Sequence, residues 1–588
     1  MPTRRTLLAA IVCLLLLGAC PLLYGQATGI ISGSVTDATG SAVAGAKVVV
    51  TAPAMGVTRD ATTDVSGHYL VPLLPVAGFT VRVEFTGFQA AEQKDVRLQV
   101  DEHREVDFRL VPASVKESVE VTATAVAVET ANPTLGQVIT SQQVAELPLN
   151  GRDFVQLATL TPGTITETNP QSFFNGGPSS EVSARGSFSL SVGGSRANST
   201  DWLFDGNDNN ELTAGGIAIL PSIDAIQEFK VLTYNYSAEY GTRAGPTVLV
   251  TTKSGSNDFH GSLFEFFRNT DLDARSFFAS YTEQFNLNQF GGSLGGPIQK
   301  DRTFFFADYQ AKMQRHGIPY VGLVPSAAMR NGDFTDDAFG NPNSTILTNP
   351  YMTGAPDPHF QCDSAGNAMP VSANGSQAPG VDCNKIPQGL INPIGQAMIN
   401  LYPLPNANNP ALGYNYVNEP VRKLNEGEFD IRLDHNFSSR DSMFARFSYD
   451  QAVSFVPGGS PGFAEESAFA STENISNHGR NAALSETHIF SERTVNQFSI
   501  GFNRISNYFT SFGSGTCESN QLGIPGANLG GISCGLTSTQ LTGYWSLGDR
   551  GYSPFQGATN VFSISDSFDM VRGKHDIRIG GNIRANQL

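Results

Sequence analysis

The chain has 588 residues, a formal net charge of −17 at pH 7, and 60 glycines and 32 prolines. This length exceeds one ordinary domain, and the Gly and Pro content is high but below that of disordered low-complexity chains. The acidic balance excludes nucleic acid as a partner, because such a partner requires clustered Lys and Arg to neutralise phosphates.

Residues 1–27 have the character of a secretory signal peptide. Arg4 and Arg5 precede an apolar run over residues 7–17, and small residues follow near Ala27. The run is too short to span a bilayer, so it predicts export and cleavage. The sequence "LGAC" before Cys20 also resembles a lipoprotein signal, although the Pro that follows is unusual in one.

Beyond the signal, no segment approaches the ~18 consecutive apolar residues of a membrane helix. An exported membrane protein with this sequence must therefore cross as a β-barrel. The remaining cysteines form two local pairs, Cys362 with Cys383 and Cys517 with Cys534. We expect two disulfides rather than zinc sites, because neither pair has close Cys spacing or a flanking His.

Residues 28–112 predict a small β-sandwich. Short alternating runs such as "GSVTDATGSAVAGAKVVV" and "FTVRVEF" are separated by Gly and Asp turns. The pattern resembles the carboxypeptidase regulatory-like domain, which has a transthyretin-type fold. Related sandwiches bind carbohydrate, but only Tyr69 and Phe88 offer aromatic surface here, so a structural spacer is the favoured interpretation.

A β-prone linker follows over residues 113–130, and "ESVEVTA" within it resembles a TonB box. Such a box binds by adding an extended strand to the sheet of TonB, so backbone donors supply most of the affinity. An ordinary linker strand is the alternative. The expected TonB-binding residues are Glu117, Ser118, Val119, Glu120, Val121, Thr122 and Ala123.

The segments after the linker resemble the plug of a TonB-dependent outer-membrane receptor, residues 131–256, running into a first barrel strand. They include "QVITSQQVAELPLNGRDFVQLATLTPGT" and "IDAIQEFKVLTYNYSAEYGTRAGPTVLVTTKSGSNDFHG". The N-terminal sandwich places the chain in the Oar-like branch of that family. The resemblance implies the TonB periplasmic domain and outer-membrane lipid as partners. It also implies an extracellular ligand, for which oligosaccharide, peptide and metal chelate all stay open.

Within this segment "DWLFDGNDNNE" has the spacing of a calcium loop. An EF-hand counted from Asp205 needs Gly at its sixth position and Glu at its twelfth, but Asn210 and Gly216 stand there. Asp and Asn make tight turns without metal. We therefore expect "WLFDG" to be a strand and "NDNNE" the turn that leaves it, with no metal or cofactor.

Residues 257–588 alternate as membrane strands do. In "EFDIRLDHNF", Phe429, Ile431 and Leu433 share one face and Asp430 and Arg432 the other, which suits lipid outside and water inside. Short turns at "QKDR", "SSRD", "SERT" and "VRGKH" alternate with long connections that hold both cysteine pairs, so we expect those disulfides outside the cell. The predicted strands are 259–268, 286–297, 302–314, 427–437, 442–451, 479–490, 494–505, 559–570 and 575–585.

The predicted fold class is mainly β: an N-terminal transthyretin/Ig-like β-sandwich in the periplasm, an α+β plug and an incomplete antiparallel transmembrane β-barrel in a Gram-negative outer membrane. Nine strands are fewer than the about 22 that close such a barrel around a plug. The chain also ends in "NIRANQL" without an aromatic last residue. We therefore expect a truncated receptor.

Catalysis is not expected. The G-x-S-x-G matches at Ser293 and Ser460 lack the strand-to-helix turn of a nucleophile, and neither HExxH nor a phosphate-binding GxxxxGK occurs. The predicted function is ligand import driven by TonB. The alternative is a cell-surface adhesin or carbohydrate-binding β-protein without transport, which would lack heat-modifiable gel mobility in an outer-membrane fraction.

Overall fold

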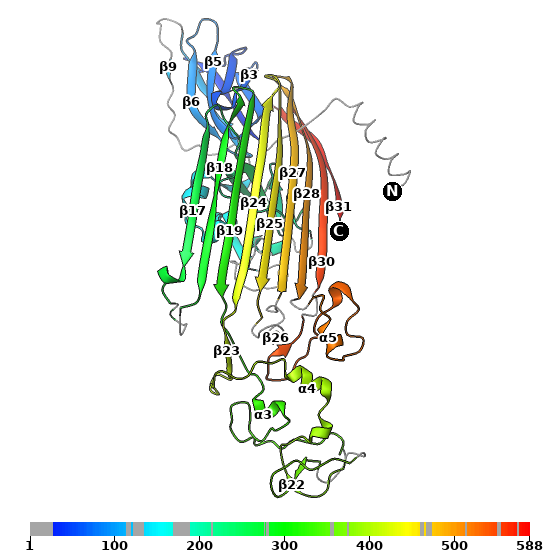
Figure 1. Cartoon of the computed structure of the whole chain (residues 1–588). Coiled ribbons are helices and arrows are strands. Elements are labelled where there is room, and N and C mark those ends of the chain that lie inside the picture. The colour runs from blue at the N-terminus through cyan, green and yellow to red at the C-terminus, as the bar shows by residue number, and fades with distance from the viewer. Residues whose placement is uncertain are drawn as a thin grey trace, which may run out of the picture.

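In the computed structural model, three units follow one another along the chain (Figure 1). They are a sandwich, an inner domain that lies against one face of a large sheet, and that sheet itself. The signal region and Ser460 lie outside the described residues. The structure describes residues 28–112, 119–120, 134–168, 188–212, 216–275, 277, 282–352, 358–372, 376–458, 464–465, 473–511, 514–549, 554–572 and 575–588.

The sandwich packs two sheets around an apolar core. One sheet has the order β4-β1-β7 with β8 also on β1, and the other has the order β3-β2-β5-β6-β9. Inward positions of the alternating strands supply the core, including Ile31, Val48, Phe79 and Val81. The elements are β1 (Gly29–Asp37), β2 (Lys47–Ala52), the 3-10 helix η1 (Pro53–Met55), β3 (Val57–Thr62), β4 (His68–Leu74), β5 (Ala77–Glu84), β6 (Ala91–Leu98), β7 (His103–Glu105), β8 (Phe108–Leu110) and β9 (Val119–Glu120).

The inner domain is built on a five-stranded sheet of order β10-β15-β16-β13-β14. A capping box at Thr140 and Gln143 starts its helix α2, and Trp202, Phe154 and Phe229 lie in its core. Its elements are β10 (Leu135–Ile139), α2 (Ser141–Glu146), η2 (Asn150–Arg152), η3 (Phe154–Leu160), β11 (Thr164–Thr168), β12 (Phe188–Val192), η5 (Ala197–Ser199), β13 (Asp201–Phe204), β14 (Asn207–Asp208), β15 (Ile226–Tyr234) and β16 (Thr247–Thr252).

Nine long strands form one antiparallel sheet in chain order, as the alternation predicted. Among the described residues β17 and β31 are its two edges, so the sheet is open there. The strands are β17 (His260–Asn269), β18 (Phe285–Gln299), β19 (Thr303–Gly317), β24 (Val421–Asn436), β25 (Asp441–Val456), β27 (Glu473–Ser491), β28 (Thr494–Ser511), β30 (Phe555–Arg572) and β31 (His575–Gln587).

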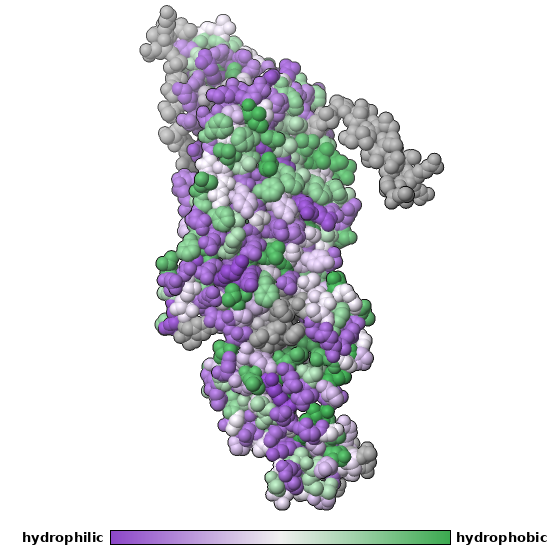
Figure 2. Space-filling view, in the orientation of Figure 1, coloured by the Kyte–Doolittle hydropathy of each residue, from purple (hydrophilic) through white to green (hydrophobic). Residues whose placement is uncertain are grey.

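The two faces of this sheet differ in polarity. Apolar side chains are exposed across the outer face (Figure 2), among them Ile431, Leu433, Phe447 and Phe562. The opposite face is buried against the inner domain and is strongly polar. Its buried polar side chains include Gln289, Asp308, Gln310, Lys312, Gln314, Glu428, Asp430, Arg432, Arg446, Ser448, Asp450, Asn481 and Asn503.

The predicted strand ends were wrong at the end of the sheet that carries long connections. There β24 begins at Val421 rather than at residue 427, and β27 begins at Glu473 rather than at residue 479. The extra residues of β24 include Arg422 and Lys423. A strand that projects beyond lipid needs no apolar outer face, so the alternation that reveals membrane strands is lost in this part.

Two long connections, residues 318–420 and 512–554, pack on each other at that end (Figure 1). Their shared apolar cluster includes Tyr416 and Trp545. In the structure Cys362 is bonded to Cys383 and Cys517 to Cys534, each pair within one connection. The elements of these two connections are β20 (Tyr320–Gly322), α3 (Ala327–Arg330), β21 (Gln361–Cys362), β22 (Val381–Asp382), η7 (Gln388–Leu390), α4 (Pro393–Ile399), β23 (Tyr416–Asn418), α5 (Glu518–Gln521), η8 (Gly531–Ser533) and β29 (Ser546–Leu547). Two further elements lie between other strands of the sheet: η6 (Thr270–Leu272) follows β17, and β26 (Ala464–Glu465) follows β25.

The short turns lie at the opposite end, next to the sandwich (Figure 1). The helices in the described part of the chain are brief, and none has the length and apolar character that a membrane crossing requires.

Candidate functional site

The Asp- and Asn-rich segment at residues 201–211 is a β-hairpin at the contact between the inner domain and the barrel wall. β13 pairs with β14, and the turn between them is Asp205–Gly206, with φ of 48° and 78°. The expectation that "NDNNE" is the turn was wrong, because Asn207 and Asp208 already form the second strand. Asp-Gly favours a two-residue turn in which both residues have positive φ.

The carboxylate of Asp205 joins the inner domain to the barrel. Within the inner domain it accepts hydrogen bonds from the Thr252 backbone N–H (2.9 Å) and hydroxyl (2.8 Å). It also forms ion pairs with two arginines of the barrel wall, with Arg446 Nε at 2.7 Å and Arg432 Nη1 at 3.3 Å. All three ionic side chains are almost completely buried. A charge cluster this deeply buried depends on every member being paired.

Aromatic rings complete the surroundings of both arginines. The Arg446 guanidinium lies 3.7 Å from the centroid of Phe204, which precedes the turn, and Arg432 lies 4.3 Å from that of Phe444. Arg432 also forms an ion pair with Asp434 at 2.9 Å. Planar guanidinium groups can stack and hydrogen-bond at once, which suits them to this interface better than Lys. The contact is therefore directional and not merely apolar packing.

The second strand of the hairpin attaches to other barrel strands. Arg584 Nη1 lies 2.9 Å from an oxygen of Asp208, and Asn481 Nδ2 donates to the Asp208 backbone carbonyl at 3.0 Å. Asn503 Nδ2 donates to the carbonyl of Asn210 at 3.0 Å. Together with the Asp205 contacts, the hairpin is bonded to β24, β25, β27, β28 and β31. It is the inner domain's anchor on the wall.

The hairpin oxygens thus accept hydrogen bonds from N–H groups and from the Thr252 hydroxyl. A group of metal-type side chains lies elsewhere, at the short-turn end of β25 and β27: Asp441, Glu486 and His488. There the His488 ring hydrogen-bonds the Asp441 carboxylate. Cross-strand pairing places these two residues opposite each other.

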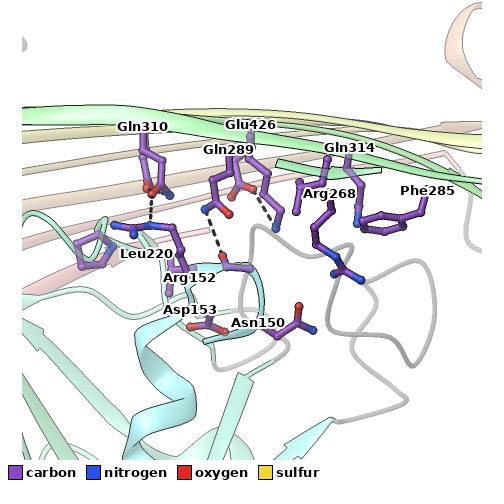
Figure 3. A pocket seen from close by; sticks show the side chains of 15 residues that line it. Asn150, Arg152, Asp153, Leu220, Arg268, Phe285, Gln289, Gln310, Gln314 and Glu426 are labelled. Atoms are coloured by element: carbon purple, nitrogen blue, oxygen red, sulfur yellow. Dashed lines mark hydrogen bonds and ion pairs between the residues drawn. The ribbon is translucent and has the colours of Figure 1, made fainter. Parts of the chain in front are cut away.

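A second contact lies nearer the long connections (Figure 3). Arg152 of the inner domain forms an ion pair with Asp224 and donates from Nε to Gln310 of β19 at 3.2 Å. Gln289 of β18 donates to the Gly151 carbonyl at 3.3 Å. A cavity between the inner domain and the barrel strands has a volume of about 30 Å³, which is room for a few waters. Lys and Glu side chains both line this cavity.

The predicted TonB box is described at two of its seven residues. Val119 and Glu120 form β9, which runs parallel to β6 at the edge of the sandwich, opposite Ala91 and Glu92. The other box residues lie outside the part of the chain that is described. The structure therefore places Val119 and Glu120 at the edge of the sandwich.

Sequence reasoning identified the inward charges of the barrel strands but not their partners. Asp205 lies more than 200 positions from Arg432 and Arg446, so no local pattern joins them. The available signal was the Asp-Gly pair, which marks a hairpin. A buried hairpin rich in acidic residues then predicts cationic partners on the facing strands.

The nine-stranded sheet and the polar lumen side define a class of protein. The outer membrane beta barrel domain family matches residues 251–588, more than half of the chain, and the carboxypeptidase regulatory-like domain matches residues 30–111. The chain belongs to the outer membrane beta barrel domain family and is a protein of the Gram-negative outer membrane.

Among particular relatives, the TonB-dependent transporter Oar of Myxococcus xanthus is 28% identical over 320 residues, which cover 51% of this chain and 28% of that protein. The outer membrane transporter YddB of Escherichia coli is similar in structure (TM-score 0.44, 10% identity, 77% of this chain and 48% of that one). A variant of the ferric enterobactin receptor PfeA of Pseudomonas aeruginosa follows (TM-score 0.38, 12% identity, 78% and 58%). The chain spans about half the length of the solved proteins.

Proposed function

We propose that this protein is a TonB-dependent outer-membrane transporter and that its inner domain is the plug. The observation that carries the proposal is the hairpin anchor. A domain that merely filled the lumen could be attached by an apolar core, but this one is attached by Asp205, Asp208 and their hydrogen-bonded partners. Polar contacts can be replaced by water when two surfaces separate, so the attachment can be opened and remade. The similarity to Oar supports the same function.

In this proposal an extracellular ligand binds at the end with the long connections, and TonB acts at the other end through residues 117–123. Traction on that segment rearranges the inner domain, and the contacts of Asp205 with Arg432 and Arg446 separate. The lumen wall exposed by this movement is polar, as a path for a hydrated solute requires.

Binding to TonB tests the proposal. The full chain, solubilised from outer membranes in detergent, is offered to an immobilised TonB periplasmic domain. Val121→Pro removes one backbone donor and fixes φ, so capture should be lost. Val121→Thr keeps the donor and the β-branched shape, so capture should be close to that of the parent.

Equal capture of both variants and the parent would contradict docking at this segment. No capture of the parent would favour the adhesin alternative. A ligand panel of oligosaccharides, peptides and metal chelates, compared in the parent and in Val121→Pro, then separates binding from import: binding should be equal and import should differ.

A further inference from the structure

The sandwich is docked on the short-turn end of the barrel (Figure 1). Arg59 donates to the Ser439 carbonyl at 3.1 Å in the turn between β24 and β25. Thr62 donates to the Glu492 carboxylate at 2.7 Å in the turn between β27 and β28. These two contacts lie on different hairpins of the barrel, so the sandwich spans the rim and does not touch it at one point only.

The loop between β2 and β3 also contacts the rim. Asn257 donates to the Pro53 carbonyl at 2.9 Å, and Asn436 donates to the Met55 carbonyl at 3.0 Å. Gly56 follows with φ of 64°, and a Cβ there would lie 2.4 Å from the carbonyl oxygen of Asp301. Only glycine permits this combination of backbone conformation and contact. The loop is therefore shaped to the rim.

The sandwich also covers the inner domain. Val100, only 1% exposed, shares an apolar cluster with Leu203 and Leu249, and Val76 packs against the same cluster. Lys230 of β15 donates to the Asp101 carbonyl at 2.7 Å. The contact thus has an apolar centre and polar surroundings, as interfaces between folded partners do.

The linker connects this docked sandwich to the predicted box. β9 is hydrogen-bonded to β6 at the sandwich edge, so force applied at residues 119–120 reaches the sandwich before it reaches the inner domain. The inner domain begins only at β10, after the linker.

We propose that the sandwich is a removable periplasmic stopper: its docked face closes the exit beneath the inner domain, and it must leave the rim before the inner domain moves. The docked face is defined by Val100, Asp101, Arg59, Thr62 and the loop containing Gly56. The docking itself is independent of the function proposed above, whereas the release step depends on it.

The first test measures docking without TonB. Val100→Cys provides a thiol that maleimide reaches only when the sandwich leaves the inner domain. Adding Gly56→Ala places a Cβ against the Asp301 carbonyl, so labelling should be faster by about tenfold, in line with a less stable closed state. The matched control is Gly40→Ala, which also has positive φ (89°) but has no atom within 4 Å of its Cβ.

The second test measures release. A bismaleimide first joins the thiols of Thr62→Cys and Glu492→Cys, which ties the sandwich to the rim. Val100→Cys is then probed in cells. The control tether joins Lys47→Cys and Asp60→Cys, an ion pair of 3.2 Å within the sandwich. Labelling of Val100→Cys should rise when TonB is present and energised, and only the rim tether should abolish the rise.

The outcomes separate the two proposals. Equal labelling of the Gly56→Ala and Gly40→Ala proteins would overturn the docked face. If TonB captures the protein but the rim tether leaves the labelling of Val100→Cys unchanged, the release step is overturned while the transport proposal stands. Absence of capture by TonB would overturn the transport proposal and the release step with it, and the Gly56→Ala comparison would still decide the docking.

Discussion

The sandwich core and the interface between inner domain and barrel are stabilised by opposite kinds of contact. The sandwich buries an almost wholly apolar set of side chains between its sheets. The barrel wall buries acids, amides and guanidinium groups against the inner domain. Exposing an apolar core to water is strongly unfavourable, whereas polar surfaces regain hydrogen bonds with water when they separate. We therefore expect the sandwich to stay folded as one unit, and the interface between the inner domain and the barrel wall to be the one that can open.

The largest effect is expected in the sandwich. Val81 is fully buried in β5. Val81→Asp places an unpaired carboxylate in the apolar core at a cost of several kcal/mol, so the sandwich should unfold while the barrel remains intact. Proteolysis followed by mass analysis should show cleavage confined to residues 28–112. The control is Arg82→Asp on the exposed face of the same strand, which should change stability by about 1 kcal/mol or less.

The next effect tests the hairpin anchor. Asp205→Ala leaves Arg432 and Arg446 buried without their shared partner and should destabilise the attachment by about 3–5 kcal/mol. With Trp545→Phe in the background, Trp202 is the remaining tryptophan and reports the inner domain during urea titration. Asp205→Asn keeps an acceptor for Thr252 and should lie between the parent and Asp205→Ala. Equal midpoints for all three proteins would refute the anchor.

The same comparison explains what the sequence could predict. The nine barrel strands and the sandwich were predicted because each depends on local alternation imposed by lipid, lumen or core. Phe429 and Asp430, for example, face opposite sides simply because they are neighbours in a strand.

Contacts between distant segments could not be predicted in this way. Asp205 meets Arg446, and Thr62 meets Glu492, only after several strands have been placed in register. Neither pair leaves a periodic signal in the sequence. The strand ends near the long connections were missed for a related reason. Beyond the membrane no lipid contacts the outer face of a strand, so its residues there need not be apolar.

A smaller effect is expected at the docked face, where pH should sharpen the comparison. Glu228 accepts a hydrogen bond from the Val100 backbone N–H. Burial is the main cause that raises the pKa of its carboxyl to about 7; the bond from Val100 opposes the rise, Glu102 adds to it, and Lys230, which is bonded to Asp101, also opposes it. Because the docked state holds an extra proton below that pKa, docking should strengthen as pH falls.

Between about pH 8 and about pH 6 the docking equilibrium should change by about tenfold if Glu228 has an ordinary pKa when undocked. Because maleimide reacts with the thiolate, the labelling rate of Val100→Cys is divided at each pH by that of Thr39→Cys, an exposed cysteine in the same sandwich. This ratio should fall accordingly. Glu228→Gln should remove the dependence of the ratio on pH. A ratio that responds to pH equally in the proteins with and without Glu228→Gln would assign the effect to another group.

The smallest effect concerns a turn type that the sandwich and the long connections share. Asp37 accepts hydrogen bonds from the Thr39 hydroxyl and the Ser41 backbone N–H, and these bonds lower the pKa of its carboxyl below 3.8. A lowered pKa means that the charged form stabilises the fold above pH 3.8 and that this contribution is lost as pH falls through the lower, folded-state value. Asp37→Asn should therefore lower the unfolding temperature of the sandwich slightly at neutral pH. The difference from the parent should vanish in acid.

Hydrogen exchange of peptides from residues 28–112 measures the difference in sandwich stability between Asp37→Asn and the parent in the full chain. Asp337→Asn changes a turn of the same sequence pattern, D-x-x-G, in the long connection 318–420 and should leave those peptides unaffected. A difference that persisted below the folded-state pKa would show that the Asp37 charge is not what stabilises the turn.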